Sequence, residues 1–152
     1  MTVSVPLVTS TIVISGLTFA DGDAMYAACG CGGGVLITDT ASVMLNDVVI
    51  TNSTANLGGG LAVFKANVGL NNNSRISNNY AQPYYLTHAP QTYVTARGGG
   101  LYMANANAAL NNAMIDGNVA DQGGGVFLQN NVLNMFGGSI NDNEAYVSGG
   151  GA

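Results

Sequence analysis

The sequence predicts an all-β fold built as a parallel β-helix, a solenoid of about five coils. The first observation is that the triplet Gly-Gly-Gly occurs five times, 26, 40, 25 and 26 residues apart; the triplets begin at Gly32, Gly58, Gly98, Gly123 and Gly149. The second is that every triplet except the last opens a short strand of the form apolar-x-apolar. The third is that no helical phrase interrupts the repeat. A unit of about 25 residues with these features suits one turn of a parallel β-helix.

Each predicted repeat contains the same elements in the same order. Glycine adopts positive φ without penalty, so the triplet is expected to form a corner. The first strand covers Val35–Ile37, Leu61–Val63, Leu101–Met103 and Val126–Leu128, with its outer two residues facing inward. A second strand ends in an apolar anchor, which is Phe19, Ile50, Ile76, Ile115 or Ile140. Five residues later a narrow inward position is predicted, occupied by Ala24, Ala55, Ala81, Ala120 and Ala145.

Asparagine is predicted to serve two purposes. The third residue after each anchor is Gly22, Ser53, Asn79, Asn118 or Asn143. Stacking of the three Asn side chains is expected to give a hydrogen-bonded amide ladder along the solenoid. Other Asn-rich stretches, such as Asn71–Asn73, suit corners because Asn tolerates left-handed backbone.

These residues also carry a family resemblance. The segment Ile14–Phe19, the later Asn-x-Ala and the following Gly-Gly-Gly-apolar phrase resemble repeats of the polymorphic outer-membrane-protein group. The resemblance implies a right-handed β-helix of the kind found in autotransporter passengers and related bacterial surface proteins. It says little about function, because such coils serve adhesins, enzymes and inert stalks.

Composition limits the classes of partner. The chain has 152 residues, and we expect a single β-helix domain, 1–152. Charged residues make up only 7%, against about 25% in ordinary soluble domains. A formal charge of −5 with three basic residues, Lys65, Arg75 and Arg97, argues against nucleic acid. No apolar stretch is long enough for a membrane-spanning helix, so no membrane insertion is expected. Solubility through Asn, Ser, Thr and Gly is typical of extracellular or cell-surface repeat proteins.

The two cysteines allow several states. Cys29 and Cys31 are separated by one glycine. They are interpreted as two thiols, as a local or intermolecular disulfide, or as metal ligands. A metal site needs further ligands at suitable spacing, and the one histidine is remote in sequence. No metal site and no cofactor are therefore predicted.

Two insertions, 25–31 and 82–97, are predicted at the same corner of different coils. The longer one contains a cluster of side chains suited to binding: Tyr84, Tyr85, His88, Tyr93 and Arg97. Insertions in solenoids often form the binding face, and Tyr with Arg is typical of interfaces. One interpretation is a loop that presents these residues to a glycan or protein. The other is a loop that covers the wall of the solenoid with its tyrosines packed inward.

Two further sets of surface residues follow from the repeat. The outward position of the first strand is apolar and predicts a stripe for lateral contact with another chain, formed by Leu36, Ala62, Tyr102 and Phe127. Covering of this stripe by a loop is the alternative. Asn52 and Asn72 match the N-glycan acceptor pattern.

A non-catalytic, extracellular structural protein is the function that these features favour. Polysaccharide-cleaving β-helices need clustered carboxylates with basic companions, and Asp21, Asp23, Asp142 and Glu144 have none at matching positions. Both ends look like open coils, so the predicted partner is a second copy, stacked head-to-tail into fibres or a surface stalk. One alternative is an adhesin-like module presenting the Tyr-rich loop, and another is a carbohydrate-active enzyme. The open ends also fit a segment of a longer β-helix.

Overall fold

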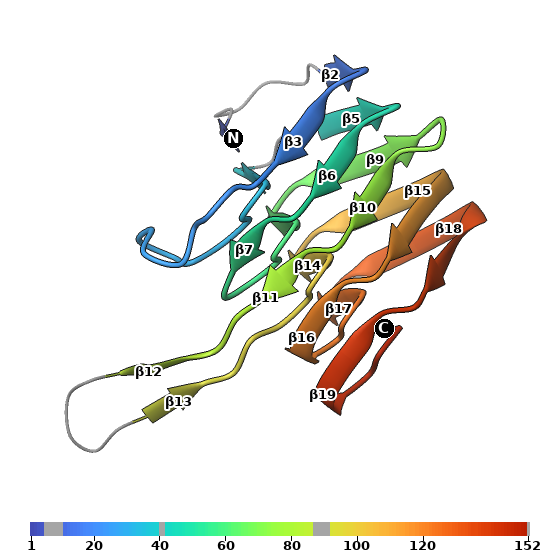
Figure 1. Cartoon of the computed structure of the whole chain (residues 1–152). Coiled ribbons are helices and arrows are strands. Elements are labelled where there is room, and N and C mark those ends of the chain that lie inside the picture. Colours follow the sequence, from blue (N-terminus) through green and yellow to red (C-terminus); the bar gives the residue numbers. More distant parts are fainter. Residues whose placement is uncertain (5–10, 40–41, 87–91, 152) are drawn as a thin grey trace.

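The protein folds into parallel β-sheets that each take strands from successive repeats (Figure 1). This computed structural model describes residues 1–4, 11–39, 42–86 and 92–151. The described residues form strands β1 to β19 and no helix. The prediction of an all-β fold is therefore confirmed. Apart from one two-stranded antiparallel hairpin, every pair among these described strands is parallel.

The first sheet contains the strands that follow the glycine triplets. Its strands lie in the order of the sequence: β1 (Thr2–Ser4), β4 (Val35–Thr38), β8 (Leu61–Phe64), β14 (Leu101–Ala104) and β17 (Val126–Gln129). The third sheet is shorter and contains β7 (Thr54–Ala55), β11 (Tyr80–Ala81), β16 (Val119–Gln122) and β19 (Glu144–Ser148). In both sheets, neighbouring strands come from neighbouring repeats.

The second sheet lies between them in the sequence of each repeat and is the largest. Its strands are β2 (Thr11–Ser15), β3 (Thr18–Ala20), β5 (Ser42–Asn46), β6 (Val49–Thr51), β9 (Asn67–Asn71), β10 (Arg75–Ser77), β15 (Asn107–Asp116) and β18 (Val132–Asn141). In the earlier repeats two short strands are separated by a bend. The long strand β15 pairs with both β9 and β10, which joins the two halves into one sheet.

The observed register confirms the predicted inward ladders. Val35 pairs with Leu61, which pairs with Leu101 and then Val126. The ladder from Ile37 through Val63 and Met103 to Leu128 follows in the same strands. The anchors from Phe19 to Ile140 also stack one upon another. All members of the first ladder are buried, and together with the anchors they form the apolar core.

The triplets form corners for two reasons. The first glycine of each has φ between 59° and 70°, the left-handed region that favours glycine. The second glycine lies against the next repeat: a Cβ on Gly59 would meet the carbonyl carbon of Tyr80 at 2.5 Å and the oxygen of Gly99 at 2.6 Å. Each of the first four triplets also donates backbone amides to carbonyls at or beside the next one, as in Gly99 N to Gly123 O at 3.2 Å. The repeats can approach this closely only without side chains.

A buried amide ladder runs beside the triplets, as predicted. The Oδ1 of Asn118 accepts hydrogen bonds from the backbone N and the Nδ2 of Asn79, both at 2.9 Å. The Nδ2 of Asn118 donates to Asn143 Oδ1 and to the carbonyl of Ile76, again at 2.9 Å. Ser53 continues the ladder, since its N binds Asn79 Oδ1 at 3.0 Å. Among the described residues, no buried side-chain nitrogen or oxygen lacks a partner.

The remaining corners use Asn and Asp in left-handed backbone. The residue two positions after each anchor has φ between 53° and 63°, and this row comprises Asp21, Asn52, Asn78, Gly117 and Asp142. A second, outward amide ladder, which the sequence analysis missed, joins Asn46, Asn71 and Asn111 at 2.9 Å and 2.5 Å. Short polar side chains therefore serve both as corners and as links between repeats.

Removing one amide of the buried ladder is expected to be costly. Asn118→Ala leaves the buried backbone N of Asn79 without its acceptor and removes a hydrogen bond to the carbonyl of Ile76, and an unsatisfied buried group costs about 1–3 kcal/mol. Asn111→Ala, on the half-exposed outward ladder, is the matched control and should cost less than about 1 kcal/mol. Urea denaturation of both variants measures the loss in the free energy of unfolding. Equal losses would show that burial does not make the inner ladder more important for stability than the outward one.

The narrow position after the anchors gives a second prediction. Ala120 is fully buried and packs with Ala81 and Ala96. Ala120→Leu should destabilise the protein by about 1–3 kcal/mol because the site has no room for the larger side chain. Ala20→Leu, at an exposed position on β3, should leave the melting temperature unchanged. A melting temperature for Ala120→Leu that matches the wild type would show that this position is not confined.

Candidate functional site

The longer insertion forms an antiparallel hairpin that projects from the sheets (Figure 1). Strands β12 (Tyr84–Leu86) and β13 (Thr92–Val94) pair directly after β11 and before the triplet at Gly98. Aromatic and β-branched residues, which are enriched in strands, make up most of β12 and β13. The tip, including His88, lies outside the described residues. The hairpin therefore departs from the third sheet at the predicted corner.

The smaller insertion returns to the same corner. Cys31, Leu57, Arg97 and Gln122 form a row of parallel bridges immediately before the successive triplets. Residues 25–31 and 82–97 both rejoin the chain at this row, so insertions of different length leave the repeat register intact. The structure joins Cys29 and Cys31 by a disulfide, which selects one of the states that the sequence left open.

The hairpin carries the three predicted tyrosines and brings two of them, Tyr85 and Tyr93, together. Tyr85 and Tyr93 are directly opposite across the two strands, and their rings lie edge-to-face with centroids 5.2 Å apart. Tyr84 pairs with Val94 at the next position, so its side chain faces the opposite side of the hairpin. Tyr84, Tyr85 and Tyr93 are 39%, 62% and 44% exposed. This exposure favours presentation of the tyrosines over packing against the sheet wall.

A buried carboxylate fastens the base of the hairpin. Asp121, on β16, is only 3% exposed and accepts a hydrogen bond from Tyr93 Oη at 2.5 Å and one from Ala96 N at 3.1 Å. The bond to Asp121 is the main cause that raises the pKa of Tyr93 to about 12. Asp121 was not among the site residues predicted from the sequence. It directly follows Ala120, the narrow inward position of its repeat, and this places Asp121 at the corner where the hairpin begins.

Arg97 does not join the tyrosines. Its guanidinium lies 5.3 Å from the ring centroid of Phe127, and its Nε donates to Gln122 Oε1 at 3.1 Å. The predicted binding set is thus divided, with Tyr84, Tyr85 and Tyr93 on the hairpin and Arg97 on the wall beside it.

The predicted lateral stripe exists, but half of it is covered. Leu36, Ala62, Tyr102 and Phe127 stack in register. Ala62 and Tyr102 are nevertheless buried, so the prediction of a freely exposed stripe is wrong for these two residues. The ring of Tyr102 is stacked on Phe127 at 5.7 Å and contacts Phe64 at 5.5 Å. Tyr102 is therefore covered by neighbouring side chains of the same sheet. Leu36 and Phe127 remain partly exposed.

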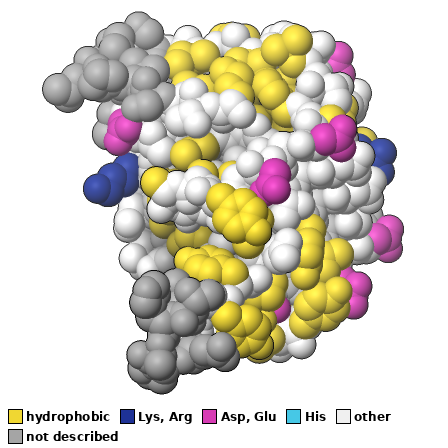
Figure 2. All heavy atoms as spheres, turned by 60° about the vertical axis from the view of Figure 1, so that its left-hand side comes forward, with side chains coloured by type: hydrophobic (Ala, Val, Ile, Leu, Met, Phe, Trp, Pro, Cys, Tyr) yellow, Lys and Arg dark blue, Asp and Glu magenta, His cyan; other side chains and the backbone are white. Residues whose placement is uncertain are grey.

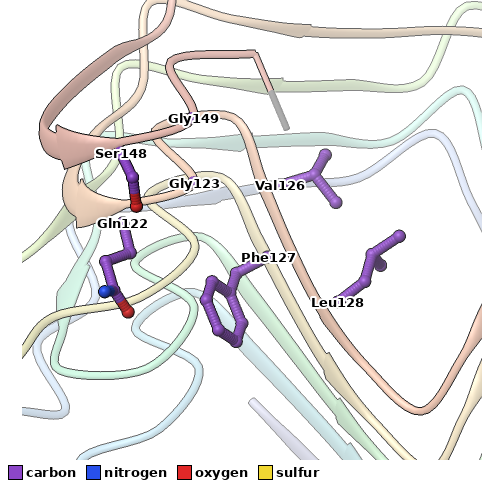
Figure 3. A pocket seen from close by; sticks show the side chains of 7 residues that line it. All are labelled: Gln122, Gly123, Val126, Phe127, Leu128, Ser148 and Gly149. Carbon is purple, nitrogen blue, oxygen red and sulfur yellow. The ribbon is translucent and has the colours of Figure 1, made fainter.

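Phe127 also lines a surface hollow at the last repeat (Figure 3). The hollow has a volume of about 380 Å³ and lies between β17 and the turn at Gly149, with Gln122, Gly123, Val126, Leu128 and Ser148 completing its lining. Figure 2 shows hydrophobic side chains, with a few acidic ones among them, spread along one face of the molecule. The apolar residues that line the hollow, Val126, Phe127 and Leu128, leave the last repeat suited to contact with another apolar surface.

The other candidate positions lie on the surface. Asn52 and Asn72 are exposed in left-handed corners, so both are accessible as predicted glycan acceptors. Arg75 and Asp116 form a two-pronged ion pair on the second sheet, with Nε and Oδ1 2.8 Å apart. Within residues 1–4, 11–39, 42–86 and 92–151 there is no cluster of three or more metal-ligating side chains. In the same ranges no helix has the length and hydropathy of a membrane span.

Comparison with known proteins adds no relative. No family model, no curated protein and no solved structure matches this chain.

The bond between Tyr93 and Asp121 predicts a titration at high pH. The pKa of Tyr93 is raised in the folded state from 10.0 to about 12. Its contribution to stability is therefore complete below pH 10 and is lost as the pH rises towards about 12. The difference in phenolate absorbance between wild type and Tyr93→Phe should show this late transition, and in an Asp121→Asn background the transition should move towards pH 10. If the Tyr93 transition stays at the same pH in Asp121→Asn, the hydrogen bond to Asp121 is not the cause of the raised pKa.

Proposed function

We propose that the chain is a right-handed parallel β-helix of about five coils that serves as a non-catalytic, extracellular structural protein. In this proposal it assembles head-to-tail with copies of itself into fibres or a surface stalk. The three parallel sheets support the solenoid, because their strands follow the order of the repeats and their inward ladders share one core. The resemblance to autotransporter passenger repeats supports the handedness and the surface location. The disulfide between Cys29 and Cys31 is compatible with an oxidising compartment.

One observation carries the assembly: at both ends of the stack of repeats, the outermost strands present the same parallel pairing edges that join the repeats within the chain. Among the described residues, β17, β18 and β19 at the last repeat each have a neighbouring strand on one side only, and β1, β2 and β3 at the first repeat do as well. Unpaired edges of this kind template further pairing. A second copy fits both edges because parallel pairing between repeats is what already holds the chain together.

The apolar ladders end at the same place. Leu45, Leu70 and Leu110 are buried in one inward ladder, whose last member, Met135, is 41% exposed. The neighbouring strands expose Leu128 at 39% and Val147 at 66%. Stacking of another copy would bury these side chains as the internal repeats bury theirs, at about 25 cal/mol per Å² of apolar surface.

The test compares two lysine variants of adjacent residues. Met135→Lys places a charge at the end of the inward ladder, where a stacked copy would bury it, whereas Phe136→Lys, one residue further, lies on the outward face. We expect wild type and Phe136→Lys to form long filaments with rising concentration and Met135→Lys to remain monomeric. Sedimentation velocity and negative-stain microscopy measure the outcome. A wild-type protein that stays monomeric at high concentration would refute the assembly.

The exposed hairpin favours a second candidate function. An adhesin-like module would use Tyr84, Tyr85 and Tyr93 to bind a glycan or a surface protein, since exposed tyrosines provide rigid, amphipathic contact area. In that case the protein would act as a monomer, and Tyr85→Phe or Tyr84→Ala would weaken its binding to a glycan array or to whole cells. The two functions are therefore separable in the same set of variants.

A further inference from the structure

We propose that the hairpin is a site of oxidative modification, at which Tyr85 and Tyr93 become joined as dityrosine by hydrogen peroxide acting through a peroxidase. The site is independent of the assembly proposed above, because it is contained within one chain. The position of the two rings and the carboxylate that binds one of them favour this reaction.

The two rings are held where a carbon–carbon bond can form between them. Tyr85 and Tyr93 are a directly opposed cross-strand pair, and side chains at such positions have Cβ atoms about 5 Å apart. Their ring centroids lie 5.2 Å apart at an interplanar angle of 60°. Rotation about the side-chain bonds then suffices to bring together the ring carbons ortho to each oxygen. A radical formed on one of the two rings therefore already has the other ring beside it as its coupling partner.

Asp121 favours Tyr93 as the residue that is oxidised first. A neutral phenol must lose its proton as it loses an electron, and an acceptor within hydrogen-bond reach assists that transfer. The Oδ2 of Asp121 lies 2.5 Å from the Tyr93 hydroxyl and is aligned as its acceptor. The carboxylate is 3% exposed, so little water competes for this bond. Tyr93 itself remains 44% exposed, which leaves its ring open to an oxidant.

The reaction balances with one molecule of peroxide. The peroxidase removes one electron and one proton from each phenol, and hydrogen peroxide is reduced to two molecules of water. The two phenoxyl radicals form one carbon–carbon bond between their ortho positions. The ortho hydrogens then move to the oxygens, which restores both phenols. The chain loses two hydrogen atoms overall and gains a covalent link between β12 and β13.

Tyr26 provides the matched control. It is 98% exposed, on the smaller insertion, and among the described residues it has no ring contact and no carboxylate bound to its hydroxyl. If exposure alone decided reactivity, Tyr26 would react first and would link different chains. The geometry instead assigns the first product to Tyr85 and Tyr93 within one chain.

The experiment treats dilute full-length protein with a haem peroxidase and limiting hydrogen peroxide. We expect a monomer that has lost two hydrogen atoms, dityrosine fluorescence, and a crosslink that fragmentation mass spectrometry maps to Tyr85 and Tyr93. Tyr26→Phe should retain this product, and Tyr85→Phe, which leaves the bond to Asp121 in place, should lose it. Asp121→Asn should slow the hairpin crosslink several-fold relative to oxidation of Tyr26 in the same sample.

Three results would overturn the proposal. One is a first product in which Tyr26 links separate chains. Another is an intramolecular crosslink whose yield is unchanged in Tyr85→Phe. The third is oxidation that consumes Tyr26 fully while Tyr85 and Tyr93 remain intact.

Discussion

The close stacking of each repeat on the next, made possible by the glycine triplets and fastened by the buried amides, is the constraint on which the structure depends. The third glycine of a triplet lies over both the ladder and the anchor: a Cβ on Gly60 would be 2.8 Å from Asn79 Nδ2 and 2.8 Å from Ile76 Cγ2. The amide of Asn79 in turn binds Ile50 O in the preceding repeat at 3.1 Å. Triplet, ladder and anchor therefore fix one another, and none can shift alone.

This constraint explains why the repeats are held together in a chain that has so few charged residues. Buried polar groups are tolerated when all their hydrogen bonds are made, and the ladder makes them along the direction of stacking. Repeats are held by main-chain pairing, by amide pairs and by apolar ladders, and these contributions add from one repeat to the next. Ion pairs have a minor part: Arg75 and Asp116 are joined on the surface, where such a pair contributes about 0–1 kcal/mol.

The sequence predicted the parts of the fold that recur. Glycine triplets, anchors such as Ile76 and ladder residues such as Asn118 occupy fixed places, and a fixed place in every repeat means a shared environment in the stack. Features that occur once were missed for the same reason. No other repeat has a carboxylate at the position of Asp121, and its bond to Tyr93 joins residues 28 apart across an insertion. The covering of Tyr102 by Phe64 depends on the direction in which side chains lean, which spacing along the chain does not reveal.

The position of the insertions separates two kinds of surface. Stacking of a further copy would use the open edges of β17, β18 and β19, whereas the hairpin leaves the third sheet at its side, between β11 and the triplet at Gly98 (Figure 1). Arg97 rejoins the row of Leu57 and Gln122 directly after the hairpin, so the extra residues do not disturb the register that stacking requires. A corner that already needs only a short connection can accept a long one at small entropic cost. The architecture can thus carry a chemically distinct element, with its own tyrosines and its own carboxylate, without altering the edges by which the protein would grow.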